Sequence, residues 1–352
     1  MSDIIDFYIG TYTAGGQSKG IYCSSLDCDK GGLSVPELVC EIRKPSFLAI
    51  HPGGDFLYSV TEGDPGRISA FRIDKESKRL EFLNISPSGG RGPCYVTVSD
   101  NGKTLFVANY VSGSVASISL NIDGTLGEVL SIIQHSGCGP VEERQEGPHV
   151  HSVNLSPDNR FAYVADLGID KVMIYSLNQA TGGILKNGGL CYKGKPGSGP
   201  RHLTFHPNGK FVYLINELDN TVAVLLHNSE DGSLSEIQVI STLPDGSTEE
   251  SKTAEVKVHP NGKFLYGSNR GADSIVIYRI DSDSGKLTTV GFQDSGIDEP
   301  RHFNIDPSGR YCIVGNQDQD SIVLFEIDRI TGELLPTGES QSVGKPICIK
   351  FL

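Results

Sequence analysis

Hydrophobic and polar residues alternate in short runs along the whole chain, and the clearest pair of runs lies within residues 199–220. Residues 203–206 and 210–215 are rich in β-branched and aromatic side chains, which favours strands. Between them, Pro207-Asn208-Gly209 supplies a fixed φ angle and then a residue that tolerates positive φ. The pattern predicts a β-hairpin, which places the start of its first strand and the end of its second strand at the same end.

The hairpin recurs at intervals of about 50 residues through the 352-residue chain. Aligning its aromatic-rich second strand gives seven equivalent positions: Tyr8, Tyr58, Phe106, Tyr163, Tyr213, Tyr266 and Ile313. The gaps between these positions are 50, 48, 57, 50, 53 and 47 residues. A period of this size is typical of solenoids and propellers, so we predict a single domain over residues 1–352.

Each copy of the repeat contains four strand-like runs. In the best copy they span residues 201–205, Phe211–Asn216, Thr221–His227 and residues 234–240. No stretch shows the 3.6-residue period of a helix, and four antiparallel strands per repeat describe a blade of a β-propeller. We therefore predict an all-β fold, a seven-bladed β-propeller whose seven first strands line a central channel. These strands are expected to start near Pro45, Pro93, Val150, Arg201, Ala254, Arg301 and Pro346.

The two ends of the chain carry parts of one blade. Ile4–Thr11 has the pattern of a second strand, and Pro346–Phe351 has the pattern of a first strand. The first blade is complete only if these two strands pair, so we predict closure of the propeller by the C-terminal and N-terminal strands. Such pairing removes the open edges of the sheet.

Composition and charge narrow the function classes. The chain has 42 Gly, 18 Pro and no Trp, as a turn-rich β protein would. Its net charge of −13 argues against general binding to nucleic acid or to anionic membranes. No apolar run approaches the roughly 20 residues of a membrane helix, and the start MSDIIDFYIG lacks the features of a signal peptide. We expect a cytoplasmic protein, a monomer or a weak homodimer.

The eight cysteines show neither a C-x-x-C pair nor the spacing of zinc ligands, so we expect them to be buried free thiols. The pair His149 and His151, separated by Val150, could hold a metal, but two ligands alone are weak support. We expect neither a metal nor a cofactor.

The hairpin geometry separates the polar residues into two sets. His51, His206 and His259 stand in one repeated position just before the proline of the turn. A polar side chain there can hydrogen-bond the backbone of the turn. We therefore predict a structural role for these three histidines.

At the opposite end of the hairpin, two repeated positions collect charged residues in blades four to seven. The strand-start position reads Ile347, Ser46, Cys94, His151, Arg201, Ala254 and Arg301 around the ring. The position after the second strand reads Tyr12, Glu62, Tyr110, Leu167, Glu217, Arg270 and Gln317. His202 and His302 lie one residue deeper. Other copies fold with Ile, Ser, Cys or Ala at the strand start, so we predict a functional cluster of the charged residues at one mouth of the channel.

The chemistry of this set is specific. Several arginines with histidines, in an otherwise acidic protein, predict a pocket for a carboxylate or a phosphate, because Arg offers a planar fork of donors. Glu217 and His151 could exchange protons with a substrate. The sequence contains neither a Gly-rich phosphate loop nor a Ser or Cys nucleophile in an elbow motif.

Three segments and the start of the chain carry a family resemblance: GPRHLTFHPNGKFVYLINEL, AEVKVHPNGKFLYGSNRG, EPRHFNIDPSGRY and FYIGTYT. Over essentially its full length, the sequence resembles the lactonase family of seven-bladed propellers. This family includes propeller-type 6-phosphogluconolactonases and a fungal carboxy-muconate lactonising enzyme. The resemblance implies four catalytic residues, which are His151, Arg201, Glu217 and Arg270. We expect four neighbours to bind substrate, namely His149, His202, Arg301 and His302.

The resemblance implies hydrolysis of 6-phosphoglucono-1,5-lactone to 6-phosphogluconate, a step of the pentose phosphate pathway, with a small anionic lactone as the partner. Glu217 or His151 would activate water as general base, one arginine would stabilise the oxyanion, and the others would bind the phosphate. Two alternatives are a cycloisomerase that closes a carboxylated muconate to its lactone, and a non-enzymatic propeller that presents its face to a partner protein.

Overall fold

The structure, a computed structural model, describes residues 4–352. These residues form 29 strands and one short 3₁₀ turn, arranged as seven antiparallel sheets. Six sheets have four strands and one has five. The prediction of an all-β fold with seven blades is therefore confirmed. Across residues 4–352, no helix has the length and apolar character of a membrane span.

The strand bounds follow the chain order. The first blade contains β29 (Pro346–Phe351), β1 (Ile4–Thr11), β2 (Gly20–Asp27), β3 (Gly32–Leu33) and β4 (Glu37–Glu41). The second contains β5 (Leu48–Ile50), β6 (Phe56–Thr61), β7 (Arg67–Ile73) and β8 (Leu80–Pro87). The third contains β9 (Pro93–Val98), β10 (Thr104–Asn109), β11 (Ser114–Leu120) and β12 (Leu126–Gln134). The fourth contains β13 (Val150–Leu155), β14 (Phe161–Asp166), the 3₁₀ turn η1 (Leu167–Ile169), β15 (Lys171–Leu177) and β16 (Ile184–Lys193).

The remaining blades have the same four-strand order. The fifth contains β17 (Pro200–Phe205), β18 (Phe211–Asn216), β19 (Thr221–His227) and β20 (Leu234–Ser241). The sixth contains β21 (Lys252–Val258), β22 (Phe264–Arg270), β23 (Ser274–Ile280) and β24 (Leu287–Gln293). The seventh contains β25 (Pro300–Ile305), β26 (Tyr311–Asn316), β27 (Ser321–Ile327) and β28 (Leu334–Ser342).

The chain forms two compact units. Among the described residues, the first unit comprises residues 4–43, Thr204–Leu226 and Glu236–Leu352. The second unit comprises Lys44–Leu203 and His227–Ser235. Blades one, six and seven belong to the first unit, and blades two, three and four belong to the second.

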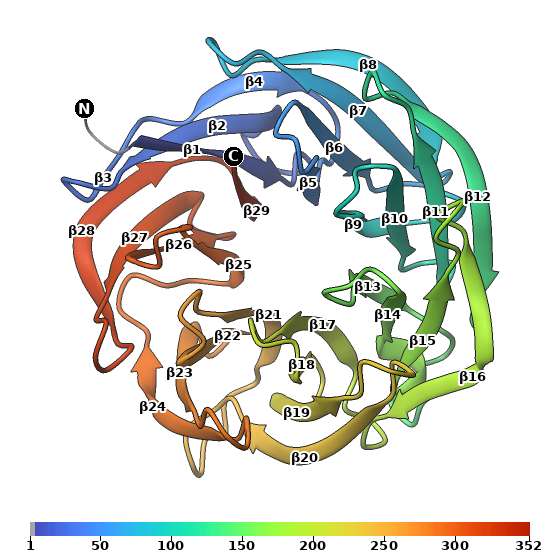
Figure 1. Ribbon diagram of the computed structural model, residues 1–352. Coiled ribbons are helices and arrows are strands. Elements are labelled where there is room, and N and C mark those ends of the chain that lie inside the picture. Colours follow the sequence, from blue (N-terminus) through green and yellow to red (C-terminus); the bar gives the residue numbers. More distant parts are fainter. Residues whose placement is uncertain (1–3) are drawn as a thin grey trace. The chain divides into compact units, whose positions relative to one another are not determined.

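The first blade is closed by the two ends of the chain. Strand β29 pairs with β1 in antiparallel register, with Ile9 opposite Ile349. Figure 1 shows the dark red β29 beside the dark blue β1. Both strands have the predicted bounds, and the predicted closure is confirmed.

Two expectations about strand bounds were wrong. The first strand of the second blade begins at Leu48 rather than near Pro45, because Lys44 has a φ of +48° and its carbonyl accepts from the N–H of Ser46 in a tight turn. The outer strand of the first blade is split into β3 and β4, which both pair with β2. Pro36 lies between them and has no N–H to donate to a ladder.

Neighbouring blades are joined by a repeated hydrogen bond. The hydroxyl of Tyr213 donates to the carbonyl of Gly285, in the outer turn of the next blade, at 3.0 Å. Gly285 has a φ of +70°, and a Cβ added there would lie 2.5 Å from the ring of Phe211. The equivalent pairs are Tyr58 with Gly124, Tyr163 with Gly232 and Tyr266 with Gly332. In these four repeats, the tyrosine of the marker position thus binds the next blade.

The histidines before the turn prolines have the predicted structural role. In the fifth blade, Nδ1 of His206 accepts from the N–H of Asn208 at 3.1 Å. Its Nε2 lies 2.9 Å from the carbonyl oxygen of Gly262, in the turn of the following blade. His51 and His259 make the same two kinds of contact. The predicted structural role of the three histidines is confirmed. Their contact with the next blade was not predicted.

All eight cysteines are free, as predicted, but only half of them are buried. Cys138 is exposed, because it lies in the loop that follows β12 rather than in a strand. Three others are half-buried, namely Cys40, Cys94 and Cys191. For these four residues the prediction of burial was wrong.

Candidate functional site

The strand-start position that collects the charged residues is a β-bulge in several blades. In blade four, Val150 pairs with Asp166 and Ser152 with Ala165, so His151 is the extra residue of a bulge. Arg301 is bulged in the same way in blade seven. Cys94 and Ile347 occupy the equivalent bulges of blades three and one. A bulge re-aims a side chain and bends its strand, so this position can differ between blades without disturbing the ladder.

In the second unit, the structure brings together His151, Arg201 and His202. The imidazole rings of His151 and His202 meet edge to face, with centroids 5.2 Å apart and an interplanar angle of 70°. Nη1 of Arg201 lies 3.3 Å from Nε2 of His202. The three residues are between 2% and 5% exposed. A guanidinium and two imidazoles therefore share one nearly buried environment.

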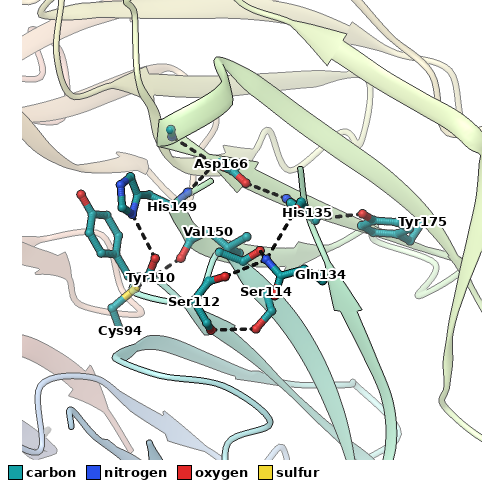
Figure 2. Close-up of polar contacts among 12 residues, drawn as sticks. Cys94, Tyr110, Ser112, Ser114, Gln134, His135, His149, Val150, Asp166 and Tyr175 are labelled. Atoms are coloured by element: carbon teal, nitrogen blue, oxygen red, sulfur yellow. Dashed lines mark hydrogen bonds and ion pairs between the residues drawn. The ribbon is translucent and has the colours of Figure 1, made fainter. Parts of the chain in front are cut away.

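Beside this group, His149 stacks on Tyr110. The two ring centroids are 4.5 Å apart at an interplanar angle of 18°, and the edge of Tyr110 also contacts His151. Nδ1 of His149 lies 3.1 Å from the carbonyl oxygen of Tyr110 (Figure 2). Its Nε2 lies 3.0 Å from Oε1 of Glu146. Because both partners are acceptors, only the imidazolium form of His149 can donate to both at once. Hydrogen bonds from its own backbone N–H and from His149 lower the pKa of Glu146.

In the first unit, the structure brings together Glu217 and Arg270. Nη2 of Arg270 lies 3.2 Å from Oε2 of Glu217 and donates to the carbonyl of Thr253 at 2.8 Å. The residues Glu217 and Arg270 are 4% and 8% exposed. On its other side, Nη1 of Arg270 lies 4.0 Å from Oε1 of Glu299. Burial raises the pKa of Glu299, while the positive charge of Arg270 opposes the shift.

Arg301 and His302 have separate partners in the same unit. The guanidinium of Arg301 lies over the ring of Tyr12, 5.4 Å from its centroid. His302 is 1% exposed, and its Nδ1 accepts from the N–H of Ile349 at 3.2 Å. Its Nε2 lies 3.2 Å from Oε2 of the buried Glu255. The contacts of His302 thus lie within the first unit's own strands.

Sequence reasoning missed two carboxylates next to the expected residues. Glu255 follows Ala254, and it therefore occupies the same deeper position as His202 and His302. The alignment of the repeats could have revealed it. Glu299 lies in the loop before Pro300 with a φ of +43°, and no repeated position points to it. Within residues 4–352, no three His, Cys, Asp or Glu side chains gather as a metal ion would require.

A family model described as "Lactonase, 7-bladed beta-propeller" matches residues 6–351. This chain belongs to that family. A 6-phosphogluconolactonase of Bacillus subtilis (strain 168) is 39% identical to it over 346 residues, which cover 98% of this chain and 97% of the relative. A 6-phosphogluconolactonase of Formosa agariphila is 35% identical over 306 residues, covering 85% of this chain and 86% of the relative.

Solved structures agree with the family. A periplasmic gluconolactonase of Pseudomonas aeruginosa is 33% identical, with a TM-score of 0.94 over 99% of both chains. The crystal structure of a Bacteroides fragilis protein is 38% identical, with a TM-score of 0.93 over 99% of this chain and 98% of the other. The family resemblance inferred from the PRH, NEL and SNRG segments is confirmed, and with it the seven-bladed propeller fold.

Proposed function

We propose that this lactonase-family protein is a 6-phosphogluconolactonase that hydrolyses 6-phosphoglucono-1,5-lactone to 6-phosphogluconate. The observation that carries the proposal is the nearly buried pair of Glu217 and Arg270, 3.2 Å apart, in a chain 39% identical to a 6-phosphogluconolactonase. A buried ion pair is costly to place, and the blade repeat does not need it, because Tyr12 and Gln317 occupy equivalent positions elsewhere. We therefore infer that the pair serves catalysis rather than folding.

Glu217 and His151 are the two candidates for the general base, because each side chain can take a proton from water. We propose that one of them activates the water and that the other orients the water or the lactone hydroxyls. An arginine of the set stabilises the tetrahedral oxyanion.

The phosphate requires several cationic donors. Arg201 and Arg301 offer guanidinium groups, and His149 adds a positive charge when both of its ring nitrogens donate. His202 lies against Arg201 and helps to hold its guanidinium. The buried contacts of His302 with Ile349 and Glu255 favour a supporting role for this residue beside Arg301.

We further propose that the seven blades act as one domain in the cytoplasm. Eight free cysteines, including the exposed Cys138, fit a reducing compartment. We propose a monomer or a weak homodimer, which size-exclusion chromatography at two protein concentrations would distinguish.

The deciding experiment measures by NMR the rate at which the protein hydrolyses freshly generated 6-phosphoglucono-1,5-lactone. Unphosphorylated gluconolactone is measured in parallel. We expect faster hydrolysis of the phosphorylated lactone, with loss of that preference in Arg201→Ala and loss of turnover in Glu217→Gln. Glu62→Gln is the matched control, because Glu62 occupies the same repeated position in blade two. Hydrolysis no faster than in buffer would reject the proposal, and turnover of carboxy-muconate instead would identify the cycloisomerase.

A further inference from the structure

A cleft of about 290 Å³ lies at the outer strands of blades three and four, within the second unit. It is bounded by the end of β12, by β15 and by β16. Its walls include four apolar residues and two lysines, namely Ile133, Ile169, Met173, Leu190, Lys171 and Lys186. None of these six residues belongs to the set proposed for lactone hydrolysis.

An irregular outer strand opens the cleft. Strand β16 pairs Lys186 with Tyr175 and Cys191 with Met173, so residues 187–190 stand opposite Ile174 alone. Gly188 and Gly189 have φ angles of +56° and +79°, which glycine adopts without strain. The sequence Asn-Gly-Gly-Leu thus makes a bulge, and its residues Asn187, Gly189 and Leu190 line the cleft.

The cleft carries positive charge that its own strands do not neutralise. Lys171 lies directly opposite Lys193 in the ladder between β15 and β16. Like charges in such a pair destabilise a sheet. Among the ion pairs within residues 4–352, none includes Lys171, Lys186 or Lys193. In a chain with a net charge of −13, this group favours an anion.

The floor of the cleft is a buried chain of hydrogen bonds. The hydroxyl of Tyr175 lies 2.9 Å from Nε2 of His135, and Nδ1 of His135 lies 2.7 Å from Oδ2 of Asp166 (Figure 2). These three side chains hydrogen-bond one another and form the polar floor of the cleft. At the rim, the side chains of Ser136 and Asn187 make no hydrogen bond within residues 4–352, so they can serve a ligand.

We propose that this cleft is a second binding site, which takes a small organic anion with an apolar body, such as an aryl or short alkyl phosphate or carboxylate. Lys171 and Lys186 receive the anionic group, as lysine does for phosphate in other sites. Ile133, Met173 and Leu190 pack against the body of the ligand. The volume is near the lower end of those of small-molecule sites.

Met173 makes the proposal directly testable, because Met1 and Met173 are the two methionines of the chain. Protein labelled with [methyl-¹³C]methionine gives a resonance from the wall of the cleft, which Met173→Leu assigns by removing it. Phenyl phosphate and benzoate are titrated as probes, with phenol as the neutral analogue and inorganic phosphate as the analogue without an apolar body.

We expect a saturable shift of the Met173 methyl resonance with phenyl phosphate or benzoate, and a weaker effect of phenol and inorganic phosphate. Lys171→Gln/Lys186→Gln should weaken binding about tenfold, from the loss of two charge contacts. Lys103→Gln removes an exposed lysine outside the cleft and should leave binding unchanged. Arg201→Ala should also leave it unchanged, which separates this site from the proposed lactone site.

Three outcomes would overturn the proposal. They are the absence of a saturable shift with either organic anion at millimolar concentration, equal affinity in the double lysine variant, and loss of the shift in Arg201→Ala. Leu190→Asp gives a second check that leaves the lysines in place, since a carboxylate in the apolar wall should abolish binding of the anion.

Discussion

Glu217 and Arg270 form an ion pair in which Oε2 and Nη2 lie 3.2 Å apart and both residues are more than nine-tenths buried. Removing one partner of such a pair leaves an uncompensated charge away from water, whereas removing both does not. The pair therefore couples the stability of the first unit to the chemistry proposed for it.

The first prediction separates these two roles. Arg270→Met should lower the free energy of unfolding by about 3–5 kcal/mol, because it removes the guanidinium that faces the buried Glu217 carboxylate. Glu217→Gln/Arg270→Met should recover most of this loss and remain inactive. Urea denaturation of the parent and of three variants (Arg270→Met, Glu217→Gln and the double variant) measures the coupling. Additive losses in the double variant would contradict a direct interaction between the two side chains.

The second prediction concerns pH. Burial raises the pKa of Glu299 above its ordinary value of 4.5. The folded protein then holds this proton more tightly than the unfolded chain, so the free energy of unfolding falls as pH rises through the interval above 4.5. Glu299→Gln removes this penalty. The variant should be more stable than the parent at about pH 7, and the difference should vanish below about pH 4.

Denaturation at a series of pH values checks this second prediction, with Glu339→Gln, an exposed glutamate, as the control. A variant that is less stable than the parent at neutral pH would mean that attraction to Arg270 outweighs the cost of burial.

The blades could be predicted from sequence because each repeat carries its own local signals. The Pro-Asn-Gly turn and the flanking β-branched residues predict strands β17 and β18, and β18 has the predicted bounds. The repeated tyrosine position marked the second strand, although its hydrogen bond to a glycine of the next blade was not foreseen. Such a contact joins residues about 70 positions apart, and no local pattern encodes it.

The candidate site was predictable only in part, because some of its features depend on residues that are distant in the sequence. Repeat alignment identified His151, Arg201 and Arg301 because charge stood where other copies carry small or apolar residues. It could not show that the strand-start position is a bulge, since a bulge depends on the register of the partner strand. It also passed over Glu299, which lies in a loop outside the repeated positions.

The third prediction concerns Asp166 as a positioning residue for the histidine segment. Its carboxylate is fully buried and accepts from the N–H of His149 at 2.7 Å, from the N–H of Gly168 at 3.0 Å and from His135. Asp166→Asn replaces one carboxylate oxygen by an NH₂ group, which then faces one of these hydrogen-bond donors. It should cost about 1–3 kcal/mol of stability, the penalty of an unsatisfied buried group.

The rate of lactone hydrolysis distinguishes the role of Asp166 from that of its hydrogen-bond partner His135. Because Asp166 fixes the backbone of His149, Asp166→Asn should also lower kcat/KM for lactone hydrolysis. His135→Gln should destabilise the protein but keep most of its activity, since the bond from Asp166 to the His149 N–H survives. Equal loss of kcat/KM in both variants would show that the whole hydrogen-bonded chain, rather than Asp166, positions the segment.

The fourth prediction tests closure of the first blade. Strand β29 buries Ile347, Cys348 and Ile349, which are at most 3% exposed, and it covers one edge of β1. Burying each such side chain contributes about 1.5–3 kcal/mol, so deletion of residues 346–352 removes an amount comparable with the whole stability of a typical domain. The truncated protein should fail to fold or should aggregate through the bare edge of β1.

A circular permutant supplies the control that a simple deletion lacks. The end of β29 lies beside the start of β1, with Phe351 opposite Phe7, so a short turn can join Leu352 to Ile4 while new termini open between Lys345 and Pro346. In this permutant β29 and β1 form an ordinary hairpin, which should fold cooperatively with thermal stability close to that of the parent. A truncated protein that matches the permutant in urea denaturation would show that the closing strand contributes little to stability.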